Sequence, residues 1–208
     1  MQLFTNYMTS TASIDSNWVI SNGISYQDYF NSIIQMVNDK TTSGADQSEE
    51  RIELTKLNMH RMKRINDASI NIDNINLSKS IGVAILTEAW CGDSAQNVPW
   101  LEHFLNAFNP KIETFYFFRD EHPDLMNQFL TNGSRSIPKT VFFEKSNGNI
   151  LATWGPRPTE IKNWLADFRA KNPEIPKHDW EIELHKYYTK NKGEAIFQDL
   201  KEIISEFS

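Results

Sequence analysis

The most constraining feature of this 208-residue chain is its only cysteine, Cys91, which lies between a strand pattern and a helix pattern. Residues 80–87 form a near-continuous apolar run, typical of a strand that is buried on both faces. A helical pattern follows the cysteine as far as about Phe108. A thiol at a helix N-terminus meets free N–H groups and a partial positive charge, and both stabilise a thiolate. The sequence therefore predicts a site for nucleophilic sulfur chemistry.

The remaining strand and helix patterns predict an α/β fold. Further strands are expected at residues 111–118, 139–144 and 150–154, and further helices at residues 123–131 and 159–171. A helix separates the first two strands, so they must pair in parallel. Residues 146–149, Ser-Asn-Gly-Asn, are a hairpin signal that makes the last two strands antiparallel. We therefore expect a mixed central sheet with helices on both faces.

The flanking segments are expected to be mostly helical. Residues 1–22 are polar and predict a loose arm, and residues 25–37 predict a helix with Ser25 as N-cap. A third helical pattern covers residues 47–67, where Asp46 and Glu49 suggest a capping box. The apolar residues of this helix cover a broad face. Its basic residues favour a solvated helix face over a binding patch: Lys56, His60, Lys63 and Arg64. The tail, residues 177–208, predicts one or two helices.

Composition excludes several classes of function. The net charge of -6 disfavours nucleic acid as a partner. No apolar run is long enough to span a membrane, and residues 1–21 lack the pattern of a secretory signal. A single cysteine fits a reducing compartment, so we expect a cytoplasmic protein. The five histidines show no metal-ligand spacing with Cys91, so no metal site is predicted. The oligomeric state stays open, with a homodimer as one option.

Three motifs resemble the thioredoxin superfamily. Residues 88–94, Glu-Ala-Trp-Cys-Gly-Asp-Ser, are similar to the family's Trp-Cys-Gly-Pro-Cys, and residues 135–141 resemble its turn with a cis proline, here Pro138. Gly155 resembles the glycine before the last helix of that fold. The resemblance implies a thioredoxin-like domain over residues 76–171. Residues 1–75 would form an N-terminal arm and helical extension packed on it, and residues 172–208 a C-terminal helical tail, as in a bacterial subgroup of thioredoxin-like proteins.

Two departures from the thioredoxin pattern change the expected chemistry. Ser94 stands where the resolving cysteine would be, and Ile85 stands where the family places a buried acid that serves that cysteine. Asp93 also replaces the usual proline. Without a second cysteine, the chain can form no internal disulfide. Whatever Cys91 does therefore requires a sulfur or an oxidant from outside the chain.

The resemblance and the local chemistry together predict the site residues. Cys91 is the expected nucleophile, and the Ser94 hydroxyl is expected to donate a hydrogen bond to its sulfur. Asp93 opposes ionisation, and the balance predicts a thiol pKa somewhat below the free value. The expected substrate-binding residues, with Trp90, Ile137 and Pro138 as an exposed apolar rim, are Trp90, Gly92, Asp93, Ile137, Pro138 and Arg157. Arg157 either holds a substrate carboxylate, such as one of glutathione, or is a surface arginine held by two prolines. Glu88 is either a proton-transfer group or a rim carboxylate.

The predicted function is thiol–disulfide exchange by a single thiol. Cys91 would form a mixed disulfide with a protein or small-molecule partner, and an external thiol such as glutathione would resolve it. No cofactor is expected beyond this co-substrate. Two alternatives stay open. One is a non-catalytic peptide-binding module on the thioredoxin scaffold. The other is a thiol peroxidase, which would need a cation such as Arg135 or Arg157 near the sulfur.

Overall fold

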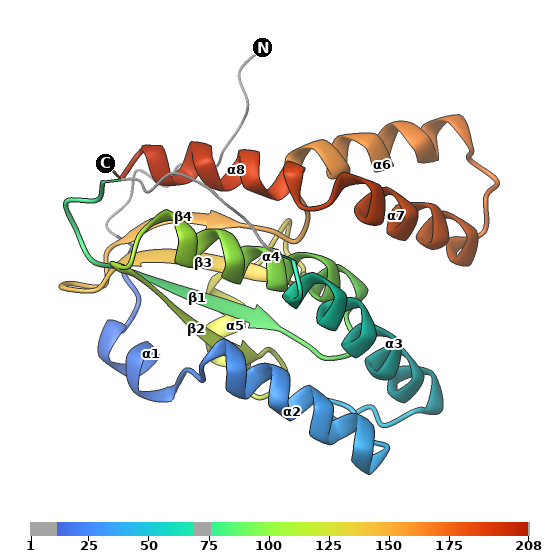
Figure 1. Ribbon diagram of the computed structural model, residues 1–208, viewed down its shortest axis with the longest axis horizontal. Coiled ribbons are helices and arrows are strands. Elements are labelled where there is room, and N and C mark those ends of the chain that lie inside the picture. The colour runs from blue at the N-terminus through green and yellow to red at the C-terminus, as the bar shows by residue number, and fades with distance from the viewer. Residues whose placement is uncertain (1–11, 69–75, 208) are drawn as a thin grey trace.

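The computed structural model describes residues 12–68 and 76–207, and its centre is one four-stranded mixed sheet (Figure 1). The strands are β1 (Ile81–Thr87), β2 (Ile112–Phe118), β3 (Lys139–Glu144) and β4 (Ile150–Trp154). Their order across the sheet is β2-β1-β3-β4. Strand β1 pairs in parallel with β2 and antiparallel with β3, and β3 pairs antiparallel with β4. The predicted mixed sheet is therefore confirmed.

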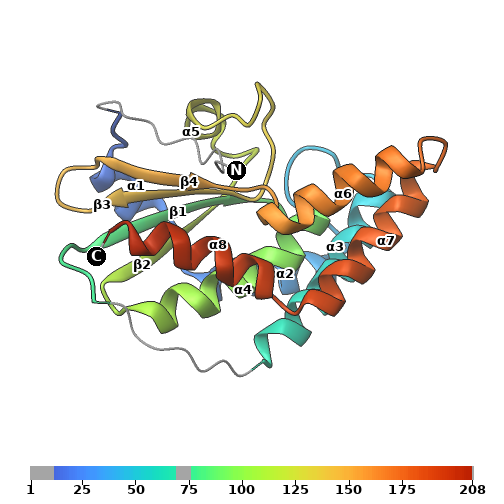
Figure 2. The ribbon, with the colours of Figure 1, turned by 90° about the horizontal axis from the view of Figure 1, so that it is seen from above.

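The helices surround this sheet and extend the fold at both ends. They are α1 (Ser16–Asn22), α2 (Tyr26–Asp39), α3 (Glu49–Asn66), α4 (Gly92–Phe108), α5 (Pro123–Gln128), α6 (Thr159–Lys171), α7 (Lys177–Asn191) and α8 (Glu194–Ser205). Seen from above, α4 and α8 lie on one side of the sheet and α5 on the other (Figure 2). The architecture is the predicted α/β fold with helical additions before and after the sheet.

Strand β1 is apolar throughout because both of its faces are buried. Ile81, Val83 and Ile85 pack into a core that also holds buried residues of α2, α3, α4 and α8. The alternate residues Ala84 and Leu86 pack into a second core with α1 and α5. Side chains alternate between the two faces of a strand, so each core receives every second residue. Strand β1 therefore ends in a fixed position, and the loop that carries Cys91 starts there.

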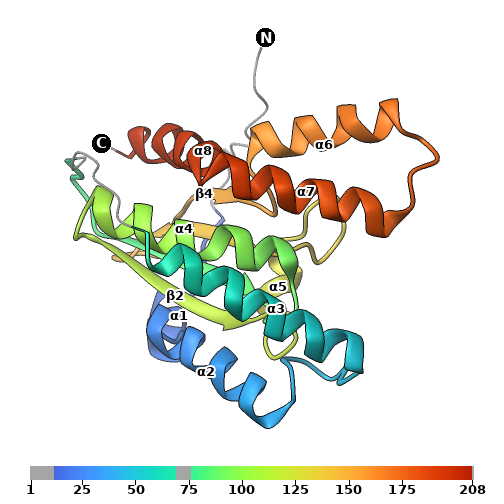
Figure 3. The same cartoon turned by 45° about the vertical axis from the view of Figure 1, so that its right-hand side comes forward.

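The tail helices form a third apolar cluster. Leu184 and Tyr188 of α7 pack with Ile161 and Leu165 of α6 and with Ala195 of α8. Helices α6 and α7 lie side by side beyond the sheet. Helix α7 is the one of the two that lies nearer to α3 and α4 (Figure 3). The tail thus reaches the side of the molecule where α4 begins.

Three local predictions are wrong. Residues 16–22 form α1 rather than a loose arm, because Asp15 caps the helix and Val19 is fully buried, while residues 1–11 lie outside the described residues. Helix α3 has Ser48 as N-cap without a side-chain cap bond, so the capping box is absent. Helix α5 ends at Gln128 instead of reaching residue 131.

The buried face of α3 also differs from the predicted apolar face. Thr55, Asn58 and Met62 are its buried residues, whereas Leu57 is 45% exposed. The polar members of this buried line have partners: Thr55 bonds Thr42, and the Asn58 amide donates to the carbonyl oxygen of Ala89 at 3.0 Å. Helix α3 is therefore bonded to the loop before Cys91.

A buried tyrosine pair joins α2 to the edge strand β2. The rings of Tyr29 and Tyr116 stack with centroids 5.4 Å apart. The Tyr29 hydroxyl shares a 2.9 Å hydrogen bond with Thr87, and the Tyr116 hydroxyl donates to Glu102 at 2.7 Å. Burial, the largest cause, raises the pKa of both phenols well above the usual value.

These phenols predict a loss of stability in alkali. The unfolded chain releases phenolic protons near pH 10, whereas the folded chain retains those of Tyr29 and Tyr116, so the free energy of unfolding falls as pH rises above about 10. Urea unfolding at a series of pH values measures this fall. Tyr29→Phe should make the fall shallower, and at pH 7 it should cost about 1 kcal/mol for the lost hydrogen bond. Ionisation of every tyrosine near pH 10 in the folded protein, seen at 295 nm, would contradict the prediction.

Candidate functional site

Cys91 is the N-cap residue of helix α4 and follows the loop after strand β1. Its Sγ atom accepts a hydrogen bond from the Ser94 backbone N–H at 3.5 Å. The thiol donates to the carbonyl oxygen of Ile137, also at 3.5 Å. The sulfur thus lies between the N-terminus of α4 and the segment that leads into strand β3. Only 9% of the residue is exposed, so the site is closed in this structure.

The segment opposite the sulfur contains a cis peptide bond between Ile137 and Pro138. Gly155, which follows strand β4, lies against it: a Cβ atom on Gly155 would lie 2.1 Å from the Pro138 carbonyl oxygen, and its φ of +112° also requires glycine. The three predicted motifs therefore meet in space. The expected exposed rim is absent, however, because Ile137 and Pro138 are buried and only Trp90 is partly exposed.

The environment of Cys91 disfavours the thiolate. Burial, the larger cause, and the negative charge of Asp93 together raise the pKa of Cys91 to about 11. The nearby Ser94 side chain and the backbone N–H groups of Ser94 and Asp93 act in the opposite direction but do not outweigh them. The expectation of a pKa below the free value is therefore wrong for this closed state. The sequence could not reveal how completely the sulfur would be covered.

Ser94 is fully buried one helical turn after the sulfur. Its backbone N–H is directed at Sγ, but its hydroxyl has no hydrogen-bond partner among residues 12–68 and 76–207. The predicted hydroxyl-to-sulfur hydrogen bond is thus not formed. The hydroxyl lies near enough to the sulfur to lower the pKa of Cys91.

Asp93 is the centre of a network that the sequence did not predict. Its carboxylate accepts two bonds from the Arg157 guanidinium, from Nη2 at 2.6 Å and from Nε at 3.0 Å. The Tyr188 hydroxyl of α7 donates to the same carboxylate at 2.9 Å, and Asn97 donates to that hydroxyl at 3.1 Å. Arg157 was expected to hold a substrate carboxylate, but here its guanidinium is occupied by Asp93.

Two arginines contact the Trp90 ring beside the sulfur. The Arg51 guanidinium of α3 stacks 3.5 Å from the ring centroid, and that of Arg119, after strand β2, lies 5.1 Å away. Such contacts are attractive because a cation meets the negative face of the ring. Arg135, the other cation considered near the sulfur, is exposed and donates to Asn127. Trp90 is thus fixed by residues distant in sequence.

Glu88 is buried rather than placed on the rim. Its carboxylate accepts hydrogen bonds from the Ser43 hydroxyl and from the Asp120 backbone N–H at 2.8 Å. Ser43 also accepts the Ala89 N–H at 2.9 Å. Burial, the largest cause, raises the pKa of Glu88. These contacts bond the loop before α3 to the loop before Cys91, so Glu88 has an evident positioning role.

Helix α7 covers the backbone next to the sulfur. A Cβ atom on Gly92 would lie 2.9 Å from the His185 ring and 3.6 Å from the Arg61 guanidinium. His185 shares a 3.3 Å hydrogen bond with Gln96. Burial, followed by the charges of Arg61 and Arg157, lowers the pKa of His185 to about 4. The sequence signalled α7 only as a weakly periodic tail, so its approach to the site was missed.

Two kinds of feature are absent from the described part of the chain. Within residues 12–68 and 76–207, no group of three or more histidine, cysteine or acidic side chains is arranged to hold a metal ion. No helix in the same residues is long and apolar enough to cross a membrane.

Comparisons with known proteins identify the fold family. A family model described as thioredoxin matches residues 44–169, more than half of the chain. A crystal structure of an HIV epitope scaffold is similar with a TM-score of 0.53, 16% identity, and coverage of 95% of this chain and 100% of that one. A Pseudomonas aeruginosa protein of unknown function has a TM-score of 0.47, 17% identity, and 94% coverage of both chains. No curated protein matches the sequence.

The Asp93–Arg157 pair predicts opposite effects from two substitutions that break it. Asp93→Asn removes the negative charge that raises the pKa of Cys91, so iodoacetamide should alkylate the thiol faster at pH 8, by roughly tenfold for each unit of pKa. Arg157→Met leaves Asp93 uncompensated, so alkylation should become slower.

The opposite signs separate electrostatics from loss of structure. If both variants merely loosened the fold, both would expose the sulfur and react faster than the native chain. Faster alkylation of both would therefore contradict the prediction. Thermal unfolding of each variant provides the control for folding.

Proposed function

Because the chain belongs to the thioredoxin family, we propose that Cys91 performs thiol–disulfide exchange as a single thiol. One observation carries this proposal: Sγ lies between the Ser94 N–H at the start of α4 and the Ile137 carbonyl before the cis bond to Pro138. That placement supports attack at sulfur from the side of residue 137. The helix N–H groups would stabilise a thiolate once the site opens.

In the first step, the Cys91 thiolate attacks one sulfur of a partner disulfide. A new S–S bond forms between Sγ and that sulfur, the partner's own S–S bond breaks, and the second sulfur leaves as a thiolate that takes up a proton. The proton that Cys91 loses goes to solvent. The product is a mixed disulfide with the protein.

In the second step, an external thiol releases the bound partner. Ser94 cannot attack the mixed disulfide, and the chain has no second cysteine. A low-molecular-weight thiolate such as that of glutathione attacks a sulfur of the mixed disulfide and forms a new one, and the displaced sulfur leaves as a thiolate. The protein returns to its thiol form when Cys91 is the displaced group.

Substrate binding requires that the segment around residue 137 open. The Ile137 carbonyl now accepts the thiol S–H, and a substrate strand would replace this bond by main-chain pairing with the same segment. The half-buried Trp90 would then border the incoming chain. Since Asp93 already occupies Arg157, substrate carboxylates are a minor part of this proposal.

The closed site sets the expected reactivity. With a pKa of about 11, the thiolate fraction of Cys91 at pH 7 is on the order of 10⁻⁴. Exchange is therefore expected to be slow at neutral pH until a partner opens the site or neutralises Asp93. The protein would therefore react with the partners that open its site, and it would not act as a general disulfide reductase.

Formation of the mixed disulfide at Cys91 can be measured directly. We expect native protein treated with glutathione disulfide to accumulate a glutathione adduct on Cys91, detectable by intact mass, and to lose it on addition of reduced glutathione. The rate of adduct formation should rise with pH toward about 11. Cys91→Ser should form no adduct.

Ser94→Cys provides the matched control. This variant restores a neighbouring thiol, so the adduct should be released without external thiol and an internal disulfide should form. A native protein that stays unmodified while its urea-unfolded form is modified would reject the exchange proposal and favour a binding module. A sulfenic acid formed faster with peroxide than the adduct with disulfide would favour a thiol peroxidase.

A further inference from the structure

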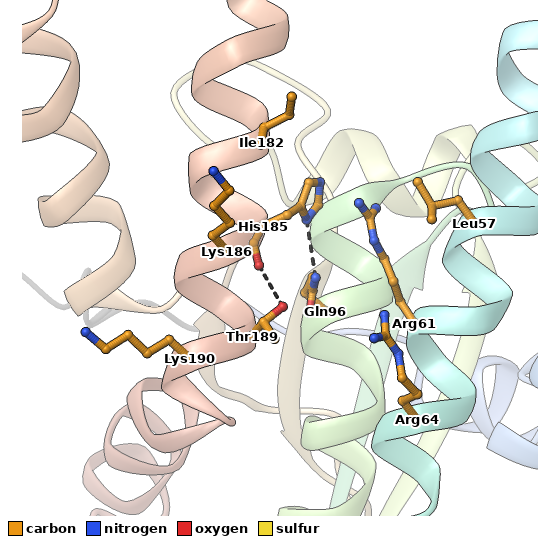
Figure 4. Close-up of a pocket in the computed structure, with 9 residues that line it drawn as sticks. All are labelled: Leu57, Arg61, Arg64, Gln96, Ile182, His185, Lys186, Thr189 and Lys190. Atoms are coloured by element: carbon orange, nitrogen blue, oxygen red, sulfur yellow. Dashed lines mark hydrogen bonds between the residues drawn. The ribbon is translucent and has the colours of Figure 1, made fainter.

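An open pocket of about 500 Å³ lies between α3, the first turns of α4, and α7 (Figure 4). Four of its lining residues carry full positive charges: Arg61, Arg64, Lys186 and Lys190. Among the described residues that line it, none is acidic. This concentration of positive charge stands out in a chain whose net charge is -6.

Among the described residues, three of these cations have no acidic partner. Lys186 is paired with Glu183 at 2.6 Å, but the side-chain bond that Arg61 forms there is to the neutral Asn58 amide. Within residues 12–68 and 76–207, Arg64 and Lys190 form neither an ion pair nor a side-chain hydrogen bond. Arg61 and Arg64 are one turn apart on α3, where side chains three residues apart are neighbours. The pocket therefore gathers like charges that no carboxylate of the described chain compensates.

The electrostatic effects on neighbouring groups agree with this arrangement. Burial and then the charge of Arg64 lower the pKa of Arg61. A protonated His185 ring would add a further positive charge beside Arg61. Because the pKa of His185 is lowered to about 4, the ring is neutral near pH 7. An anion in the pocket would offset this repulsion, because opposite charges in a partly buried site attract more strongly than in water.

The same pocket has an apolar end. Leu57 of α3 and Ile182 of α7 both line it, and they are 45% and 41% exposed. In Figure 4 these two side chains lie toward one end, Arg64 lies toward the other, and the Lys190 side chain extends away from Arg61 and Arg64. An occupant that fits both ends has an apolar group joined to an anionic group.

We propose that this pocket binds a small organic phosphate, with its phosphate against Arg61 and Arg64 and its apolar group against Leu57 and Ile182. A phosphate monoester carries a charge of about −1.5 to −2 at pH 7, which suits two neighbouring arginines better than the single charge of a carboxylate does. An arginine guanidinium can also donate two parallel hydrogen bonds to the oxygens of one phosphate group. The volume is in the range of small-molecule sites.

Phenyl phosphate is the probe for this proposal, measured by calorimetric titration at low ionic strength. We expect saturable binding to the native protein and a weaker affinity, by about tenfold or more, for Arg64→Glu. Arg64 is exposed, so this variant should fold. Lys63→Glu is the matched control: it makes the same charge change on the adjacent, exposed residue of α3, which does not line the pocket.

Two other ligands test the two parts of the occupant. Inorganic phosphate should bind more weakly than phenyl phosphate, and benzoate should bind more weakly still. Equal binding of inorganic phosphate would overturn the role of the apolar end, and equal binding of benzoate would overturn the choice of phosphate. Absence of any heat with phenyl phosphate at about 10 mM, or an equal loss in Lys63→Glu, would overturn the site itself.

Discussion

The carboxylate of Asp93, in the first turn of helix α4, is bonded to two distant parts of the chain at once. It accepts a two-point bond from Arg157 after strand β4, and it accepts the Tyr188 hydroxyl from α7. A largely buried ion pair stabilises a fold only when its bonding capacity is nearly complete, and here both carboxylate oxygens are engaged. The position of α7 and the electrostatics at Cys91 both depend on this one group.

The same carboxylate charge that bonds helix α7 also lowers the thiolate fraction of Cys91. Asp93 is the second cause, after burial, of the high pKa of Cys91. Arg157 compensates part of this charge through its two bonds to the carboxylate. A thiol that stays protonated in the closed state reacts slowly with adventitious disulfides and oxidants, because they meet few thiolates.

Local pattern predicted most of the fold. The strands were expected within one or two residues because their apolar runs reflect burial on both faces, and Ser25 was expected correctly as the N-cap of α2. The site was predicted less completely. The bonds of Ser43 to Glu88, of Arg51 to Trp90 and of Tyr188 to Asp93 join residues far apart in sequence, and no local period encodes such contacts. The closed state of Cys91 follows from these long-range contacts, so the predicted pKa had the wrong direction.

The buried face of helix α8 has a consequence for the order in which the chain acquires its structure. Ile196, Leu200 and Ile204 fill the same core as Val83 and Ile85 of strand β1, more than a hundred residues earlier. While a ribosome synthesises the chain, α2, α3 and α4 can pack against β1 and β2 long before α8 exists, but the part of this apolar face that α8 covers stays exposed until residue 204 has emerged. The nascent domain can therefore complete its core only after translation of α8, and its earlier intermediates expose apolar surface that favours aggregation.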